Sequence, residues 1–194
     1  MKLLWITHRK FDDFCATTPI AFAKGLVGSG LDLTIINPES EGSHSDAEWE
    51  HIGLGVNAVR GFQSRTFSKK VLAHFESMEL DFDAYMMDWQ VGVNVGKVLA
   101  QQNRPCFLMD RSPPADTGIL AKLQWKGWKD AWRLVKNGLF TSGFVVSNAH
   151  LRFVSQSLNI PGTNISVLEA GVAAIDDVTP LSRKHGEEWK FVYH

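Results

Sequence analysis

The segment Asp83-Ala84-Tyr85-Met86-Met87-Asp88 is an apolar run with a carboxylate at each end. A run this short and this apolar is typical of a strand that is buried on both faces of a parallel sheet. Residues 91–102 follow with a helical pattern, and they predict the crossover helix that a parallel strand requires. Gly92 and Gly96 would let this helix lie close to the sheet. The segment therefore predicts one strand and one helix of an α/β fold.

The same alternation of short apolar runs and longer helical segments extends along the chain. Strands are predicted at 3–7, 31–36, 105–109, 143–146 and 165–168, with helices over 17–28, 67–78, 117–136 and 147–158. Residues 39–55, which are rich in Glu, Ser, Gly and His, are predicted to form an exposed loop, and 57–60 a short strand. The pattern predicts a Rossmann-like, doubly wound α/β fold with a mainly parallel sheet and helices on both faces.

Composition narrows the class of protein. The chain has 194 residues, of which 44% are hydrophobic and 21% charged, as in a globular domain. Its formal net charge of −1 gives no electrostatic support for nucleic-acid binding. No apolar run approaches the roughly 20 residues of a membrane-spanning helix, and the apolar N-terminus is too short for a secretory signal. Two cysteines suit a reducing compartment, so we expect a cytoplasmic location.

Four pieces of sequence, in this order, resemble the N-terminal half of a family 4 glycosyltransferase with the two-domain GT-B fold. They are the opening strand and polar loop of 3–18, Tyr85-Met86-Met87-Asp88-Trp89, Gly143-Phe144-Val145-Val146-Ser147-Asn148, and Ile160-Pro161 followed by the strand and turn of 165–172. Two features depart from the family. The loop of 8–18 has no glycine, and Glu169-Ala170-Gly171-Val172-Ala173 stands where the family usually has Pro-Asn-Gly-Val-Asp.

The resemblance implies both an architecture and an activity. Residues 1–172 would be the acceptor-side N-terminal domain, 173–188 a linker, and 189–194 the first strand of a C-terminal domain. The whole enzyme would move a sugar from a nucleoside-diphosphate sugar to a hydroxyl of a lipid or saccharide, with no metal needed, and this piece alone would be inactive. Two alternatives stay open: a non-catalytic module that binds a glycan or a partner, and an unrelated nucleotide-binding domain.

Polar residues follow most of the predicted strands. Because ligands of an open parallel sheet bind beyond the carboxyl ends of its strands, we expect these residues to surround one crevice. The family's base is an Asp or His of this domain, so Asp88 and Asp13 are the catalytic candidates. The residues expected to bind substrate are His8, Arg9, Trp89, Gln90, Arg111, Ser112, Ser147, Asn148, Glu169 and Gly171.

Each candidate also has a purely structural interpretation. Asp88 would serve as base or acceptor ligand, or else cap the next helix. Asp13 would be an acceptor-side acid or part of a solvated turn. Arg111 suits a phosphate or carboxylate ligand, and the alternative is a salt bridge to a neighbouring aspartate. His8 would hydrogen-bond a sugar or phosphate oxygen, or play a structural part.

Two further groups have weaker signals. His44, Asp46 and His51 lie within one predicted loop, but their spacing matches no standard metal site, so no metal is expected. Nothing pairs Cys15 or Cys106 with a general base, so both thiols are expected to be inert.

The predicted helix 117–136 carries an aromatic ridge flanked by basic residues. Trp125, Trp128 and Trp132 share one face, and lysines or arginine follow each of them. Such a helix can lie in the headgroup region of an anionic membrane, which suits an enzyme with a lipid acceptor at the inner membrane face. The alternative is that the tryptophans pack on the sheet and the lysines form its solvated edge.

Overall fold

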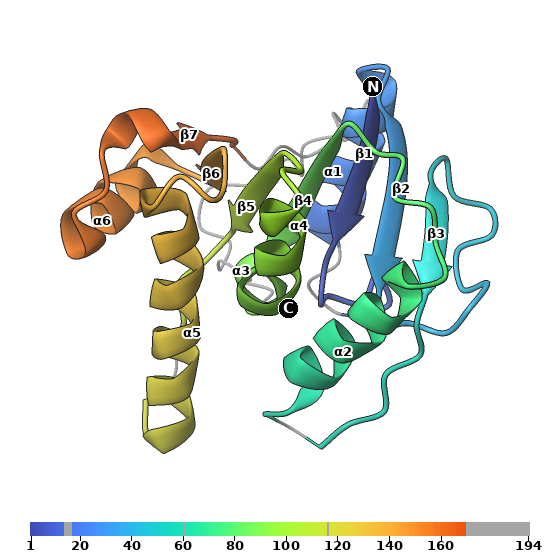
Figure 1. The fold of residues 1–194 in the computed structure, drawn as a ribbon, viewed down its shortest axis with the longest axis horizontal. Coiled ribbons are helices and arrows are strands. Elements are labelled where there is room, and N and C mark those ends of the chain that lie inside the picture. The colour runs from blue at the N-terminus through green and yellow to red at the C-terminus, as the bar shows by residue number, and fades with distance from the viewer. Residues whose placement is uncertain (14–16, 60, 116, 170–194) are drawn as a thin grey trace, which may run out of the picture.

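A computed structural model describes residues 1–13, 17–59, 61–115 and 117–169. Over this part of the chain, seven parallel strands form one sheet in the order β3-β2-β1-β4-β5-β6-β7 (Figure 1). The strands are β1 Lys2–Ile6, β2 Asp32–Asn37, β3 Glu50–Gly53, β4 Ala84–Asp88, β5 Cys106–Asp110, β6 Ser142–Val145 and β7 Ile165–Val167. The predicted Rossmann-like α/β fold is confirmed.

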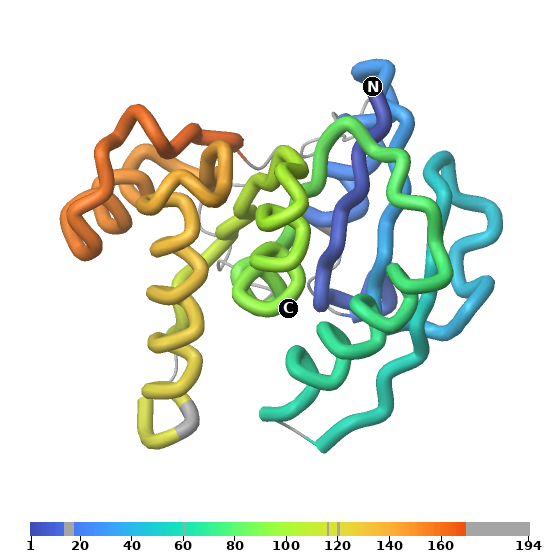
Figure 2. The backbone as a smooth tube through the Cα atoms, viewed as in Figure 1, coloured from blue at the N-terminus to red at the C-terminus, as the bar shows by residue number. Residues whose placement is uncertain are grey.

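Helices connect these strands and cover both faces of the sheet. They are α1 Thr17–Gly28, α2 Gln63–Phe75, α3 Trp89–Val91, α4 Lys97–Gln101, α5 Ile119–Lys136 and α6 Asn148–Leu158, with the π-helix η1 Gly92–Gly96 between α3 and α4 and the short 3₁₀ helix η2 Gly162–Asn164 before β7. Figure 2 shows α1 on one face of the sheet and α2 on the other, with the N-terminal ends of α2 and α5 extending past the carboxyl ends of the strands.

Two hydrophobic cores result from the alternation of side chains along the strands. Leu4 and Ile6 of β1 face the core that α2 to α6 cover. Leu3 and Trp5 face the opposite core, which α1 covers through Ala23. The central strands are therefore buried on both faces, as their apolar sequences predict.

The edge of the sheet differs from the sequence prediction. Strand β3 occupies 50–53, inside the predicted loop of 39–55, and no strand forms at the described residues 57–59. The prediction failed because β3 is a short, half-exposed edge strand with a single apolar side chain, Ile52. Its position comes from parallel pairing with β2, where Thr34 lies opposite Glu50.

The crossover after β4 is helical, as predicted, and it lies close to the sheet at Gly96. A Cβ atom added at Gly96 would lie 2.2 Å from Cζ of Phe140. A Cβ atom at Gly92 would meet Leu108 at 3.4 Å, which is ordinary contact. Gly96 is thus the glycine of this pair that the packing requires.

Helix α5 packs its tryptophans into the domain. Trp128 and Trp132 are fully buried, while Lys122, Lys126 and Lys129 are exposed. The interpretation in which the tryptophan ridge enters a membrane is therefore wrong for these two residues, because their rings are part of the core. The alternative, in which the tryptophans pack on the sheet beside a basic edge, is confirmed for them.

None of the helices in the described ranges combines the length and the apolar character required to cross a bilayer.

Candidate functional site

The centre of the sheet places two predicted residues together. Strand β1 lies between β2 and β4. The chain runs from β1 through β2 to β3 at one edge and then crosses back to β4 on the other side of β1. Ligands of such sheets bind at this switch point in the strand order. His8 follows β1 directly, and Asp88 is the last residue of β4. The parallel register, with Ile6 opposite Met87, brings the two residues to the same edge.

Asp88 is held by hydrogen bonds from the end of β1. Its Oδ2 accepts a 2.6 Å hydrogen bond from the Thr7 hydroxyl and lies 3.3 Å from Nδ1 of His8. Although Asp88 precedes helix α3, its side chain makes no capping bond. The interpretation of Asp88 as a helix cap is therefore wrong.

The charge of Asp88 is stabilised within the protein. Burial of this carboxyl would raise its pKa, but the hydrogen bond and charge of His8 and the hydroxyl of Thr7 outweigh burial and hold the pKa below its usual value. The charge of Arg111 acts in the same direction. Asp88 is thus an ionised, buried carboxylate with an imidazole beside it.

A surface hollow of about 300 Å³ opens next to His8. His8, Arg9, Lys10 and Asp13 line one side of it, and the other side comes from Pro38, Val56 and α2 through Gln63, Ser64 and Phe67. The side chain of His8 is 21% exposed, whereas that of Asp88 is only 6% exposed. His8 therefore faces this hollow, and Asp88 lies behind it, largely shielded from solvent.

The residues after β4 and β5 form a neighbouring group. The indole N–H of Trp89 donates to the backbone carbonyl of Ser112 at 3.3 Å. Gln90 lies in the same short helix α3, half-exposed. Arg111 lies close enough for its charge to influence Asp88.

The remaining predicted residues lie toward the other edge of the sheet, where they follow β6 and β7. Ser147 caps α6, and its side chain accepts from the backbone N–H of His150. Asn148 and Glu169 are exposed at the ends of β6 and β7. None of these three lines the hollow beside His8. Gly171, the linker 173–188, the strand 189–194 and Cys15 lie outside the described residues.

A second buried carboxylate, Asp110, had no predicted role of its own. Its Oδ2 accepts hydrogen bonds from the indole N–H groups of Trp128 at 2.6 Å and Trp132 at 2.8 Å, and Nε2 of His150 lies 3.2 Å away. Asp110 thus joins β5 to α5 and α6. The regular spacing of the tryptophans along α5 was the sequence signal that could have indicated a buried partner for their indole N–H groups.

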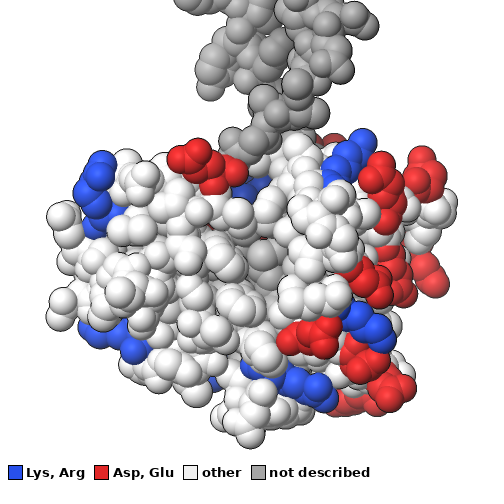
Figure 3. All heavy atoms as spheres, turned by 90° about the horizontal axis from the view of Figure 1, so that it is seen from above, with Lys and Arg blue, Asp and Glu red and all other residues white. Residues whose placement is uncertain are grey.

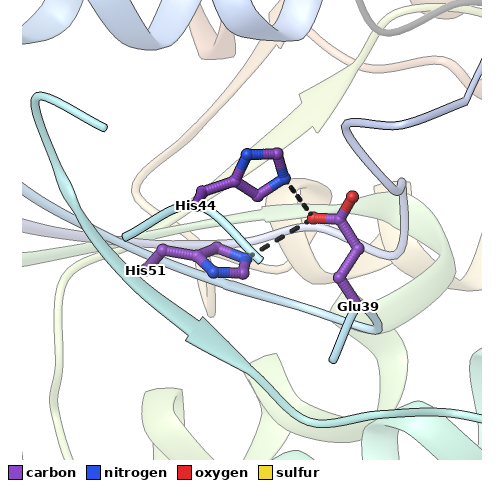
Figure 4. A group of neighbouring side chains, drawn as sticks. All are labelled: Glu39, His44 and His51. Atoms are coloured by element: carbon purple, nitrogen blue, oxygen red, sulfur yellow. Dashed lines mark hydrogen bonds and ion pairs between the residues drawn. The ribbon is translucent and has the colours of Figure 1, made fainter. Parts of the chain in front are cut away.

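A third polar cluster forms after β2. Glu39 is buried and lies beside His44 and His51, which contradicts the prediction that 39–55 is simply an exposed loop (Figure 4). Asp46, which the sequence grouped with the two histidines, is exposed and is not a member of the cluster.

The cysteine that the structure describes is inert. Burial of Cys106 raises the pKa of its thiol to about 12, so the reactive thiolate is absent at neutral pH.

Comparisons by sequence identify no family. No model of a protein family matches the chain, and a search of curated proteins finds no significant match.

Comparisons of structure do find the fold. UGT2 of Phytolacca americana, solved with UDP-2fluoro-glucose and pterostilbene, matches with a TM-score of 0.56 at 12% identity, over 91% of this chain and 55% of that one. UDP-N-acetylglucosamine 2-epimerase from Rickettsia bellii matches with a TM-score of 0.59 at 8% identity, over 88% and 45%. A glycosyltransferase from Rickettsia africae matches with a TM-score of 0.55 at 14% identity, over 87% and 42%.

The chain therefore has the α/β fold found in glycosyltransferases that use UDP-sugars and in a UDP-sugar epimerase. It spans about half the length of these proteins. At such low identities the likeness shows the fold alone, and the activity is argued from the site.

Proposed function

We propose that this chain is the acceptor-side half of a glycosyltransferase and that His8 is its general base. The observation that carries the proposal is the His8–Asp88 pair, which lies at the switch point of the sheet and beside a surface hollow. A base in hydrogen-bond contact with an orienting carboxylate is a recurring arrangement for activating a hydroxyl group. This assignment moves the base from Asp88, the candidate chosen from sequence, to its neighbour.

The chemistry follows from which ring nitrogen is engaged. Nδ1 of His8 faces Asp88, so the proton on Nδ1 is held by the carboxylate and Nε2 is left to accept a proton. The acceptor hydroxyl gives its proton to Nε2 as its oxygen bonds to the anomeric carbon of the donor sugar. The bond from that carbon to the phosphate oxygen breaks, and the nucleoside diphosphate leaves. The ionised Asp88 stabilises the imidazolium that forms.

Positive charge near the base would assist the leaving diphosphate. Arg9 and Lys10 line the same hollow as His8, and Arg111 lies near Asp88. Cationic groups stabilise the negative charge that develops on a leaving phosphate. Three structural neighbours were solved in complex with UDP, which supports a uridine diphosphate sugar as donor.

The finer features remain part of the proposal. We infer a lipid or saccharide acceptor, membership of family 4, a cytoplasmic location, no metal in the transfer step, and a second domain after the linker of 173–188. A contact between 117–136 and an anionic membrane is also proposed, now through the exposed Lys122, Lys126 and Lys129. Co-sedimentation with anionic vesicles at low salt tests this contact. If replacing these lysines leaves the amount of protein that pellets with the vesicles unchanged, the contact is excluded.

The decisive test is sugar transfer by the full-length gene product. His8→Ala should lower the rate by about 10²–10⁴-fold, the usual contribution of a general base. Asp88→Asn should cause a smaller loss, because the base stays but its orientation weakens. His74→Gln is the matched control, since His74 lies in the last turn of α2, away from the hollow. Full activity in His8→Ala would refute the proposal, and absence of transfer by the wild type would favour the non-catalytic alternative.

A further inference from the structure

Glu39, His44 and His51 come from three different parts of the edge of the sheet. Glu39 follows β2, His44 belongs to the connection between β2 and β3, and His51 lies in β3. One carboxylate oxygen and one nitrogen from each imidazole lie within 4.8 Å of one another. Figure 4 shows both rings directed at the same oxygen of Glu39. The fold therefore gathers three metal-ligand groups without a local sequence motif.

Two of the three distances between the ligand atoms are close to those of a small tetrahedral ion. Oε2 of Glu39 lies 2.9 Å from Nε2 of His44 and 3.5 Å from Nε2 of His51. Bond lengths of about 2.0–2.2 Å to zinc place two ligand atoms of a tetrahedral site about 3.3 Å apart. Shifts of a few tenths of an ångström at these two edges are enough to reach that geometry.

The surroundings of the cluster fix the carboxylate. The other oxygen of Glu39, Oε1, accepts hydrogen bonds from the backbone N–H groups of Phe11 at 2.8 Å and Asp12 at 3.0 Å. Asn37 donates its side-chain N–H to Oε2 and accepts from the backbone N–H of Glu39. Such outer contacts orient a metal ligand, and they leave a lone pair of Oε2 for an ion.

The two imidazoles are also suited to a metal. The rings pack edge to face, with centroids 4.8 Å apart, and the ring of Phe11 lies 5.6 Å from that of His44. Nε2 of His51 now bonds to Oδ1 of Asn37 at 2.9 Å, and its Nδ1 has no partner among the described residues. Coordination through Nε2 would exchange that single hydrogen bond for a metal bond.

The charge of the surface favours a cation here. Figure 3 shows acidic side chains gathered on the side of the molecule that carries β2 and β3. Exposed carboxylates of the connecting segment and of the first residue of β3 contribute to this side, namely Glu41, Asp46, Glu48 and Glu50. A surface of one sign raises the local concentration of ions of the opposite sign.

We propose that Glu39, His44 and His51 bind a zinc-like divalent transition-metal ion. Two imidazoles and one carboxylate are a ligand set that zinc accepts, with water as the fourth ligand. Solvent reaches the site on the side of His44, whose side chain is partly exposed. None of the three ligands lines the hollow beside His8, so the ion takes no part in sugar transfer. Its role is to fix Glu39, which in turn holds the backbone of Phe11 and Asp12 beside that hollow.

The test uses the whole chain after treatment with a chelator. Zinc is titrated against a coloured competing chelator, and a second titration uses cobalt, whose visible absorption reports a tetrahedral site. One ion per chain should bind. His44→Gln and Glu39→Gln should weaken binding by at least about 100-fold, the upper end of the loss expected from an outer contact alone. Zinc should also slow hydrogen exchange at the backbone N–H groups of Phe11 and Asp12.

Controls separate this site from adventitious binding. His74→Gln removes a histidine outside the cluster and should bind zinc as the wild type does. His44 is 23% exposed, so its replacement is the variant that folding tolerates best, and circular dichroism verifies its structure. Failure of the wild type to bind zinc would overturn the proposal, as would unchanged binding in His44→Gln. Neither result affects the sugar-transfer assay, which depends on His8 and Asp88.

Discussion

The hydroxyl of Thr7 donates a 2.6 Å hydrogen bond to Oδ2 of Asp88 and so joins the ends of the neighbouring strands β1 and β4. Both residues are buried, and 81 positions separate them in the sequence. Oγ1 of Thr7 also accepts from the backbone N–H of Arg9, at the start of the loop beside the hollow. One small side chain thus fixes the carboxylate and the first turn of the loop.

Thr7→Val should therefore destabilise the fold. Valine keeps the shape of threonine but leaves Asp88 without its closest donor, a loss of about 1–3 kcal/mol for a buried group. Urea unfolding measures the difference in the free energy of unfolding. Thr7→Ser keeps the hydroxyl and should recover most of it, and equal stabilities for the valine and serine variants would show that the hydrogen bond contributes little.

Stability should depend on pH through Asp88. Its pKa in the folded protein lies below the value of 3.8 that it has when exposed. The ionised carboxylate therefore stabilises the folded state above pH 3.8, and this contribution is lost as pH falls through the lower folded value. Asp88→Asn should be less stable than the wild type at pH 7, and the difference should shrink in acid. Denaturation at several pH values tests this, and a constant difference would contradict it.

Asp110 should be a major contributor to the stability of the α5 side. Its carboxylate accepts from Trp128 and Trp132, and hydrogen bonds to a charged group are each worth about 1.5–3 kcal/mol. Asp110→Ala should lower the free energy of unfolding by at least that amount and shift the tryptophan fluorescence. Asp130→Asn is the control, because Asp130 pairs with the exposed Lys126 and Arg133, and such pairs contribute about 0–1 kcal/mol.

Two glycines should respond to alanine in opposite ways. A Cβ atom at Gly143 would lie 2.3 Å from the buried ring of Trp132, so Gly143→Ala should destabilise by about 1–3 kcal/mol. At Gly127, inside α5, the nearest atom is 3.9 Å away, and alanine should stabilise by up to about 1 kcal/mol. Thermal unfolding compares the two variants, and the same sign for both would refute the packing argument.

The sequence predicted the central architecture because buried parallel strands have a simple pattern. Strands β1, β2, β4 and β5 are short apolar runs followed by polar residues, and each was placed within a residue or two. Strand β3 was missed because an exposed edge strand carries no such run. Its residues are held by pairing with β2, a tertiary contact that a local pattern does not contain.

The sequence named His8 and Asp88 as candidates, and the structure places the two side chains in contact. Their roles stay a proposal. His8 and Asp88 were both chosen because they follow strands, but only the strand order shows that β1 and β4 are neighbours. His8 is the more exposed of the two side chains and faces the hollow. For this reason we propose the histidine, and not the aspartate, as the base. Glu39 was overlooked because it lies in a polar stretch that resembles an exposed loop, and its burial depends on the backbone of Phe11 and Asp12.

The position of β1 between β2 and β4 also constrains how the protein folds. A pairing of β1 with β2 closes a loop of about thirty residues, whereas the pairing with β4 must close one of about eighty. Closing the longer loop costs more chain entropy and delays the contact. His8 and Asp88 therefore come into contact only after β4 has docked beside β1. A ribosome-bound chain that has not yet released residue 88 cannot form this contact.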